Sequence, residues 1–149
     1  MHEALVEWIG IDDDSPLSLP GAMRHLSDVW ARRGEPNVVL VHYDDLLADL
    51  EGQMRCLAGT LGIAVEEQSW PALVEAATFK RMKSRTDMHP PPSSGIAPDP
   101  AFFFRRGTSG AGREILSDEE LASYHARAAQ LAPPDLIEWL HRRITGALS

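Results

Sequence analysis

The hydrophobic positions of the chain follow a helical period over most of its first half. Apolar residues recur three and four positions apart over residues 3–9, about 21–33 and 44–62. This spacing places them on one stripe of a helix, so it predicts three amphipathic helices. In the third, we expect Asp44 or Asp45 to cap the start and a glycine, at position 62, to close the end. The stripe of this third helix consists of Leu47, Leu50, Met54, Leu57 and Leu61.

One segment breaks the helical pattern. Residues 37–43 contain four consecutive apolar side chains, three of them valine. This composition predicts a strand buried on both faces, as in the middle of a parallel sheet. The sequence shows no second convincing strand, and a lone buried strand would leave its backbone groups unpaired. The chain is therefore interpreted as part of an α/β fold whose other strands lie in a missing N-terminal segment or in a second chain.

The second half is expected to be helical at both ends and irregular between them. Helical patterns cover about 67–77 and a short turn at 78–83, and residues 84–100 form a proline-rich loop. A loop of this length in a compact domain is usually functional or mobile. A capping box at Ser117-Asp118-Glu119-Glu120 predicts the start of another helix, and Pro133-Pro134 predicts the start of the last one.

Composition narrows the functional classes. The chain has 149 residues, enough for one domain with a core, and a net charge of -8 with a pI of about 5.1. An acidic surface repels phosphate backbones, so we expect no nucleic-acid partner. The single cysteine, Cys56, allows no internal disulfide and no thiolate metal cluster. No apolar run reaches membrane-spanning length and the N-terminus lacks a secretory pattern, so a cytoplasmic protein without a metal is expected.

The strongest chemical signal is the run Phe103-Phe104-Arg105-Arg106-Gly107. Two adjacent guanidinium groups offer planar, bidentate donors, and glycine lets a backbone N–H approach an anion closely. The run therefore suits a phosphate monoester. The alternative is an ordinary solvated arginine pair beside an aromatic patch.

Three short motifs occur in an order and spacing that resemble a known family. Tyr43-Asp44-Asp45-Leu46 ends the predicted strand, Thr78-Phe79-Lys80-Arg81-Met82 precedes the long loop, and Phe104-Arg105-Arg106-Gly107 follows it. Together they resemble the sulfotransferases that use 3′-phosphoadenosine-5′-phosphosulfate (PAPS), from about Trp30 to the C-terminus. The tail, with Gln130-Leu131-Ala132-Pro133-Pro134, looks most like bacterial members acting on lipid or glycolipid acceptors. The resemblance implies a P-loop-like α/β fold of which this chain is the C-terminal part.

The resemblance also implies roles in holding PAPS or its product 3′-phosphoadenosine-5′-phosphate (PAP). Arg105, Arg106 and the N–H of Gly107 would hold the 3′-phosphate, and Phe79 would lie against the adenine face. The remaining residues of the implied adenine pocket are Thr78, Met82 and Tyr43. The alternative for Phe79 and Met82 is plain core packing, and the alternative for Tyr43 is a hydroxyl at the solvent edge.

Two departures from the family pattern concern the glycine loop and the catalytic half. The Asp and Trp that usually follow the loop glycine are absent from Gly110 to Ser117, which implies a looser lid. The 5′-phosphosulfate loop and the catalytic histidine of the family have no match, and Gly107-Thr108-Ser109-Gly110 lacks the lysine such a loop needs. None of the six histidines has an acidic partner that spacing can establish. No catalytic residue is therefore predicted.

Two interpretations remain open. Residues 1–149 are either a partial sulfotransferase domain, inactive alone, that needs a missing N-terminal half, or a non-catalytic helical interaction module on an inherited scaffold. The first implies a hydroxyl-bearing small molecule or glycolipid as acceptor of the complete enzyme. The second is favoured by a homodimer that pairs the unpartnered strands. An intact small enzyme of another kind has no recognisable set of catalytic residues here.

Overall fold

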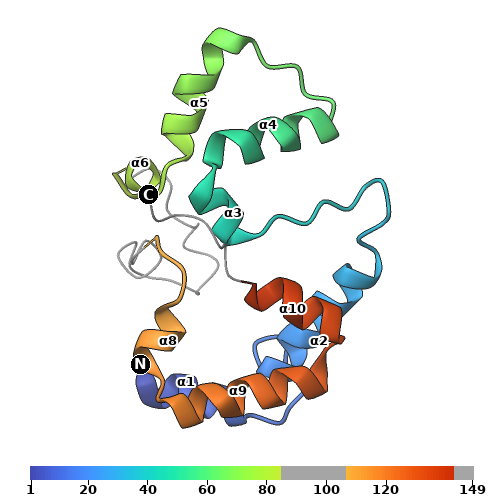
Figure 1. Cartoon of the computed structure of the whole chain (residues 1–149), viewed down its shortest axis with the longest axis vertical. Helices are drawn as coiled ribbons and strands as arrows, with labels where there is room; N and C mark the ends of the chain where they lie inside the picture. Colours follow the sequence, from blue (N-terminus) through green and yellow to red (C-terminus); the bar gives the residue numbers. More distant parts are fainter. Residues whose placement is uncertain (85–106, 143–149) are drawn as a thin grey trace. The chain divides into compact units, whose positions relative to one another are not determined.

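The computed structural model describes residues 1–84 and 107–142, and the regular structure in these two ranges is helical (Figure 1). The chain divides into two compact units. The first unit contains residues 1–42 and those from 110 onward, and the second contains residues 43–109.

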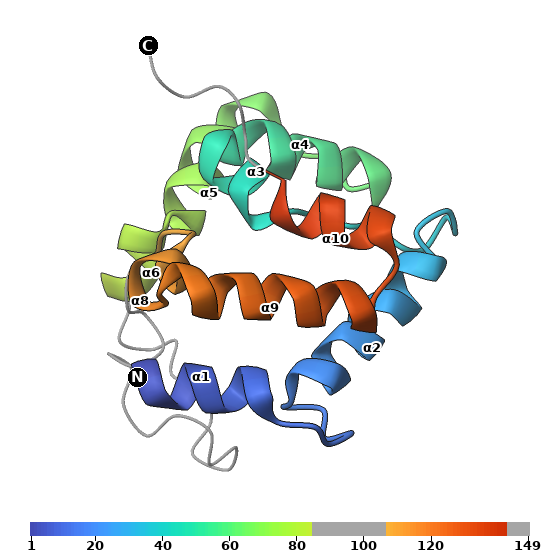
Figure 2. The ribbon, with the colours of Figure 1, turned by 60° about the horizontal axis from the view of Figure 1, so that its bottom comes forward.

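The first unit is built around the longest of its described helices, α9 (Asp118–Leu131). This helix packs against α1 (His2–Gly10), α2 (Leu19–Ala31) and α10 (Pro134–His141), and Figure 2 shows it running between α1 and α10. A short helix, α8 (Ala111–Ile115), precedes it. The centre of the core is formed by Leu19, Met23 and Ala128, all buried.

Side-chain caps fix the starts of two of these helices. The hydroxyl of Ser18 accepts a hydrogen bond from the N–H of Gly21 (3.1 Å) at the start of α2. At the start of α9, Ser117 Oγ accepts from the N–H of Glu120 (3.2 Å), whose carboxylate accepts from the N–H of Ser117 (2.8 Å). The predicted capping box is therefore confirmed. The helices predicted near residues 3–9 and 21–33 are also confirmed, and each end lies within two residues of its predicted position.

The second unit differs from the prediction at one helix. A single helix was expected after Asp44 or Asp45, but the structure has α3 (Tyr43–Ala48) followed by α4 (Leu50–Thr60). The break has a local cause, because Asp49 Oδ1 accepts a hydrogen bond from the N–H of Gly52 (2.8 Å) and starts a new helix. The unit continues with η1 (Glu67–Ser69), α5 (Trp70–Ala77) and α6 (Phe79–Ser84), close to the predicted ranges.

The predicted glycine at the end of α4 is confirmed by its backbone. Gly62 has a φ of 68°, in the left-handed region that favours glycine. The N–H of Ile63 donates to the carbonyl of Ala58 (2.8 Å), and that of Gly62 donates to the carbonyl of Gly59 (3.2 Å). This pair of bonds is the Schellman arrangement that ends many helices.

In the second unit, one arginine and one tryptophan connect α4 with η1 and α5. Arg55 on α4 donates to both oxygens of Glu67 (2.9 and 2.6 Å) and to Glu51 (2.7 Å), and its guanidinium lies 4.5 Å from the ring centre of Trp70. Trp70 is 6% exposed and is the one buried hydrophobic residue of this unit among the described residues. The hydrogen bonds from Arg55 hold the pKa of the Glu67 carboxyl below its usual value and raise that of Arg55.

The predicted strand at residues 37–43 does not form in the described part of the chain. Asn37 lies in a turn, Tyr43 opens α3, and Val38 to His42 have no regular secondary structure. A strand is defined by its hydrogen bonds to a neighbour, and the described residues offer this segment no neighbouring strand. The α/β architecture therefore stays a prediction.

Candidate functional site

Helix α6 differs in charge from the other helices. Lys80, Arg81 and Lys83 are exposed on it and it carries no acidic residue. Every other helix in the described ranges has a formal charge of zero or below when histidine is counted as neutral. In a chain with a net charge of -8, this helix is therefore the one among the described helices that repels an anionic ligand least.

An aromatic ring beside this helix lies against a glycine far along the sequence. Gly107 has a φ of 65°, and a Cβ built on it would penetrate the ring of Phe79, the first residue of α6. A side chain at position 107 would therefore be strained by its backbone and blocked by the ring. The structure thus brings together two of the residues predicted to hold the nucleotide.

Thr78 and Met82 lie at the two ends of the first turn of α6. Thr78 Oγ1 accepts from the N–H of Arg81 (3.2 Å) and donates to the carbonyl of Glu75 (2.8 Å), so it caps the helix. The N–H of Met82 donates to the carbonyl of Thr78 (2.9 Å), and both side chains are half-buried. Thr78 therefore fixes the start of the helix that carries Phe79.

Sequence reasoning did not single out Lys83. Its ammonium lies 6.0 Å from the centre of the Phe79 ring, at the outer limit for a cation–π contact. The ammonium therefore adds a positive charge beside the ring. The sequence did contain a signal for this cation, because three basic residues occur within four positions at 80–83 of a chain that is acidic as a whole.

The contact between Phe79 and Gly107 does not include Tyr43. Tyr43 is 47% exposed at the start of α3, and within the described ranges no ring contact or hydrogen bond joins it to Phe79. Arg105 and Arg106 lie outside the described residues. Their assignment to the 3′-phosphate stays a prediction.

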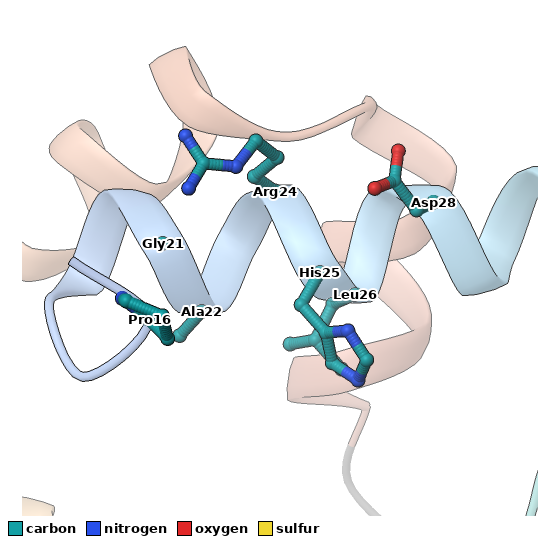
Figure 3. Close-up of a pocket in the computed structure, with 7 residues that line it drawn as sticks. All are labelled: Pro16, Gly21, Ala22, Arg24, His25, Leu26 and Asp28. Atoms are coloured by element: carbon teal, nitrogen blue, oxygen red, sulfur yellow. The ribbon is translucent and has the colours of Figure 1, made fainter. Parts of the chain in front are cut away.

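The first unit has a wide hollow along α2, of about 670 Å³. The guanidinium of Arg24, which lines this hollow, is already paired with the carboxylate of Asp14 at 2.6 Å. In Figure 3, Arg24 and His25 point to opposite sides of the helix. The polar groups of this hollow therefore do not converge on one point, which a phosphate site requires.

Histidines of the first unit have partners that spacing alone could not reveal. His2 Nε2 lies 2.9 Å from Glu120 Oε2, a carboxylate 118 residues away. His141 Nδ1 donates to the carbonyl of Ile137 (3.0 Å), so its Nε2 accepts from the hydroxyl of Tyr124 (3.1 Å). Burial, the nearby His125 and Arg113 lower the pKa of His141, and burial raises that of Tyr124. These contacts are those of structural histidines.

The described residues contain no group of three or more histidine, cysteine, aspartate or glutamate side chains arranged to hold a metal ion. None of their helices is long and apolar enough to cross a bilayer.

Comparison with known proteins identifies the family. The model of the sulfotransferase domain matches residues 18–132, which is most of the chain. The chain belongs to the sulfotransferase domain family. The family predicted from the three motifs is therefore confirmed. Sulfotransferases of this family use PAPS as the sulfuryl donor.

The curated relatives of this sulfotransferase chain are longer proteins. It is 41% identical over 125 residues to a glycolipid sulfotransferase of Mycobacterium bovis, and 40% identical to one of Mycobacterium tuberculosis. A luciferin sulfotransferase of Photinus pyralis is 23% identical over 130 residues. Each alignment covers 83% of this chain but 38%, 38% and 32% of the respective relative, so the chain spans less than two fifths of their length. No solved structure matches it.

Proposed function

We propose that this chain supplies the 3′-phosphoadenosine part of the PAPS site in a sulfotransferase of glycolipid type. The observation that carries the proposal is the packing of Phe79 over Gly107. These residues come from two separate motifs of the family pattern, and they lie together beside the basic helix α6. Plain core packing of Phe79 would not require a glycine with a positive φ beside it.

The surroundings of Phe79 match the chemistry of an adenosine phosphate. Adenine is a planar base that stacks favourably on an aromatic ring, at about 1–3 kcal/mol per base in nucleic-acid complexes. Lys83 beside the ring meets the negative charge, while Arg105, Arg106 and the N–H of Gly107 bind the 3′-phosphate. Thr78 and Met82 frame the pocket, and Tyr43 reaches its adenine side.

The complete enzyme transfers a sulfuryl group from PAPS to an acceptor hydroxyl, and the mycobacterial relatives favour a glycolipid as the acceptor. The role of this chain is to anchor and orient the nucleotide, which supplies a large part of catalysis in such transfers. We expect no turnover by this chain alone, because its sequence has no lysine-bearing phosphosulfate loop.

The test is the melting temperature of the purified chain with and without PAP. A ligand at one hundred times its Kd stabilises the folded state by about 2.7 kcal/mol, which corresponds to a rise of roughly 5 to 10 °C in a domain of this size. The rise is expected in the wild type and is expected to disappear in the double variant Arg105→Ala/Arg106→Ala.

The chain offers a matched control in a second adjacent arginine pair. Arg32 and Arg33 lie at the end of α2 in the first unit, and Arg33 pairs with Asp135 at 3.1 Å. The variant Arg32→Ala/Arg33→Ala is expected to melt at a lower temperature but to keep the full rise caused by PAP. A cooperative melt of the wild type that PAP leaves unchanged would contradict the proposal and favour the interaction module.

A further inference from the structure

One face of helix α6 has no role in the nucleotide site. Each residue of an α-helix is turned by about 100° from the one before, so Phe79 and Met82 share a face and Lys80 and Arg81 lie on the opposite one. Phe79 and Met82 are half-buried, whereas Lys80 and Arg81 are exposed. The implied adenine pocket uses the first pair and assigns nothing to the second. We call Lys80 and Arg81 the outer face of α6.

The outer face carries positive charge that no neighbour compensates. Within the described ranges, neither side chain makes a hydrogen bond, an ion pair or a ring contact. Outside α6, the described part of the second unit has one other basic residue, Arg55, and it is paired with Glu51 and Glu67. The positive potential of this part of the unit is therefore concentrated on α6.

We expect the outer face to stay at the surface of the complete domain. Lysine and arginine are almost never fully buried unless they are paired, because burial of an unpaired charge is very costly. The rest of the domain can cover an apolar side chain that this chain exposes, but it can cover these two charges only by supplying counter-charges. Exposure is therefore more informative at Lys80 and Arg81 than at an exposed leucine.

We propose that the outer face of α6 docks the enzyme on the surface of a bilayer that contains anionic lipid. The choice of a bilayer rests on the proposed function, because the lipid chains of a glycolipid acceptor hold it in a bilayer. Anionic headgroups attract lysine and arginine side chains at the membrane surface and strengthen binding about fivefold for each residue. The charge of the face and the class of acceptor therefore point to the same partner.

Docking through the outer face brings the nucleotide site to the level of the headgroups. An α-helix with its side chains is about 10–12 Å across, so Phe79 on the opposite side of α6 lies about that far from the docked plane. The headgroup region is about 5–8 Å deep on each side of a bilayer. A sugar hydroxyl in that region stands close to a nucleotide held by Phe79 and Gly107. Donor and acceptor then meet while the lipid chains stay in the bilayer.

Other anionic partners fit the outer face less well. Nucleic acids bind proteins without sequence preference through many phosphate contacts, and this face offers two charges on a chain whose net charge is -8. The mycobacterial relatives are named for a glycolipid, which favours a lipid surface over a nucleic acid or an acidic polypeptide.

The experiment measures sedimentation of the whole chain with two kinds of vesicle. One consists of phosphatidylcholine alone, and the other contains equal amounts of phosphatidylcholine and phosphatidylglycerol. We expect the chain to prefer the anionic vesicles and to lose this preference at high salt, because salt screens exposed charges. The variant Lys80→Gln/Arg81→Gln is expected to bind them about 30-fold more weakly, since each lost charge costs about fivefold.

The matched control is Arg32→Gln/Arg33→Gln, which removes the same two charges from the end of α2 in the first unit. It is expected to bind anionic vesicles as the wild type does. Three results would overturn docking through the outer face: equal binding of the wild type to both vesicles, an equal loss in the two double variants, or tighter binding to a DNA oligonucleotide than to anionic vesicles at the same phosphate concentration.

The melting temperature with PAP separates docking from nucleotide binding. Lys80→Gln/Arg81→Gln is expected to keep the full rise caused by PAP while it loses vesicle binding. A variant that loses both would place the two residues in the nucleotide site and overturn docking through the outer face. A wild type that prefers anionic vesicles but does not respond to PAP would support docking and contradict the proposed nucleotide site.

Discussion

The two units of this chain are stabilised by different means. The first has a buried apolar centre at Leu19, Met23 and Ala128, shared by α2 and α9. The second has Trp70 as its one buried hydrophobic side chain among the described residues, held by the charged contacts of Arg55. It also exposes five large apolar side chains: Tyr43, Leu47, Leu61, Ile63 and Leu73. The unit that carries the candidate nucleotide site is therefore the one with less core of its own.

This difference indicates which unit depends more on contacts outside its own core. Hydrophobic burial is the main favourable contribution to folding, at about 25 cal/mol per Å² of apolar surface. A unit that exposes much of its apolar surface gains little of this contribution alone. We therefore expect the second unit to open more readily than the first and to gain most from a ligand or a partner polypeptide.

The largest effect is expected from Trp70→Ala in the second unit. Removing a buried tryptophan costs about 3–5 kcal/mol, which we expect to exceed the local stability of that unit. Hydrogen exchange should then show α4 and α5 unprotected while α9 keeps its protection. Equal loss of protection in both units would mean that they fold as one cooperative body.

The reciprocal change is Leu19→Ala in the first unit. Leu19 is fully buried, and truncation of such a leucine costs about 2–5 kcal/mol. Protection should fall in α2 and α9, measured by the same exchange experiment. The control Leu17→Ala changes a side chain that is 84% exposed and should cost less than about 0.5 kcal/mol. A similar loss in both variants would contradict the assigned core.

A smaller effect is expected from Thr78→Ala, which removes the cap of α6. Loss of a threonine cap costs about 1 kcal/mol and should raise exchange at the N–H of Arg81. The control is Thr60→Ala, because Thr60 Oγ1 only donates to the carbonyl of Cys56 within α4. PAP affinity should fall in Thr78→Ala and stay unchanged in Thr60→Ala. Equal PAP affinity in the two variants would mean that the cap of α6 does not contribute to the nucleotide site.

The smallest effect concerns pH. The pKa of His141 is lowered in the folded first unit. The stability that His141 contributes is therefore complete above pH 6.5, the ordinary pKa of histidine, and is lost as the pH falls below that value. The pKa of Glu67 is lowered from 4.5, so its contribution to the second unit is lost only at still lower pH. Between pH 7 and 5, the first unit should therefore weaken while the second does not.

Exchange rates corrected for their intrinsic pH dependence would measure this difference. His141→Gln should remove the pH effect on α9 and α10, whereas His25→Gln, at an exposed position on α2, should retain it. A pH effect that survives in His141→Gln would assign it to another group of the first unit.

Local rules made most of the described helices predictable from the sequence. The capping box at Ser117, the glycine at position 62 and the apolar stripes depend on residues within four positions of one another. The break at Asp49 was missed because the apolar stripe of residues 47–61 continues across it, so its period gave no sign of a second cap. A cap is a polar interaction and hydrophobic spacing does not report it.

Features that depend on distant residues were less predictable. The strand at residues 37–43 needs a neighbour that the described residues lack, and the contact of His2 with Glu120 joins positions 118 residues apart. The approach of Phe79 to Gly107 followed from the family motifs and not from periodicity. The adjacent Lys83 was missed because the family motif ends one residue before it.

The nucleotide site is tested most directly by an NMR titration of the ¹⁵N-labelled chain with PAP. We expect the amide shifts to concentrate at residues 78–83 and at Gly107, and we expect Gly107→Ala to abolish them while α9 of the folded protein stays unchanged. Shifts confined to α9 and α10, or none at a large excess of PAP over folded protein, would contradict a nucleotide site at Phe79 and Gly107.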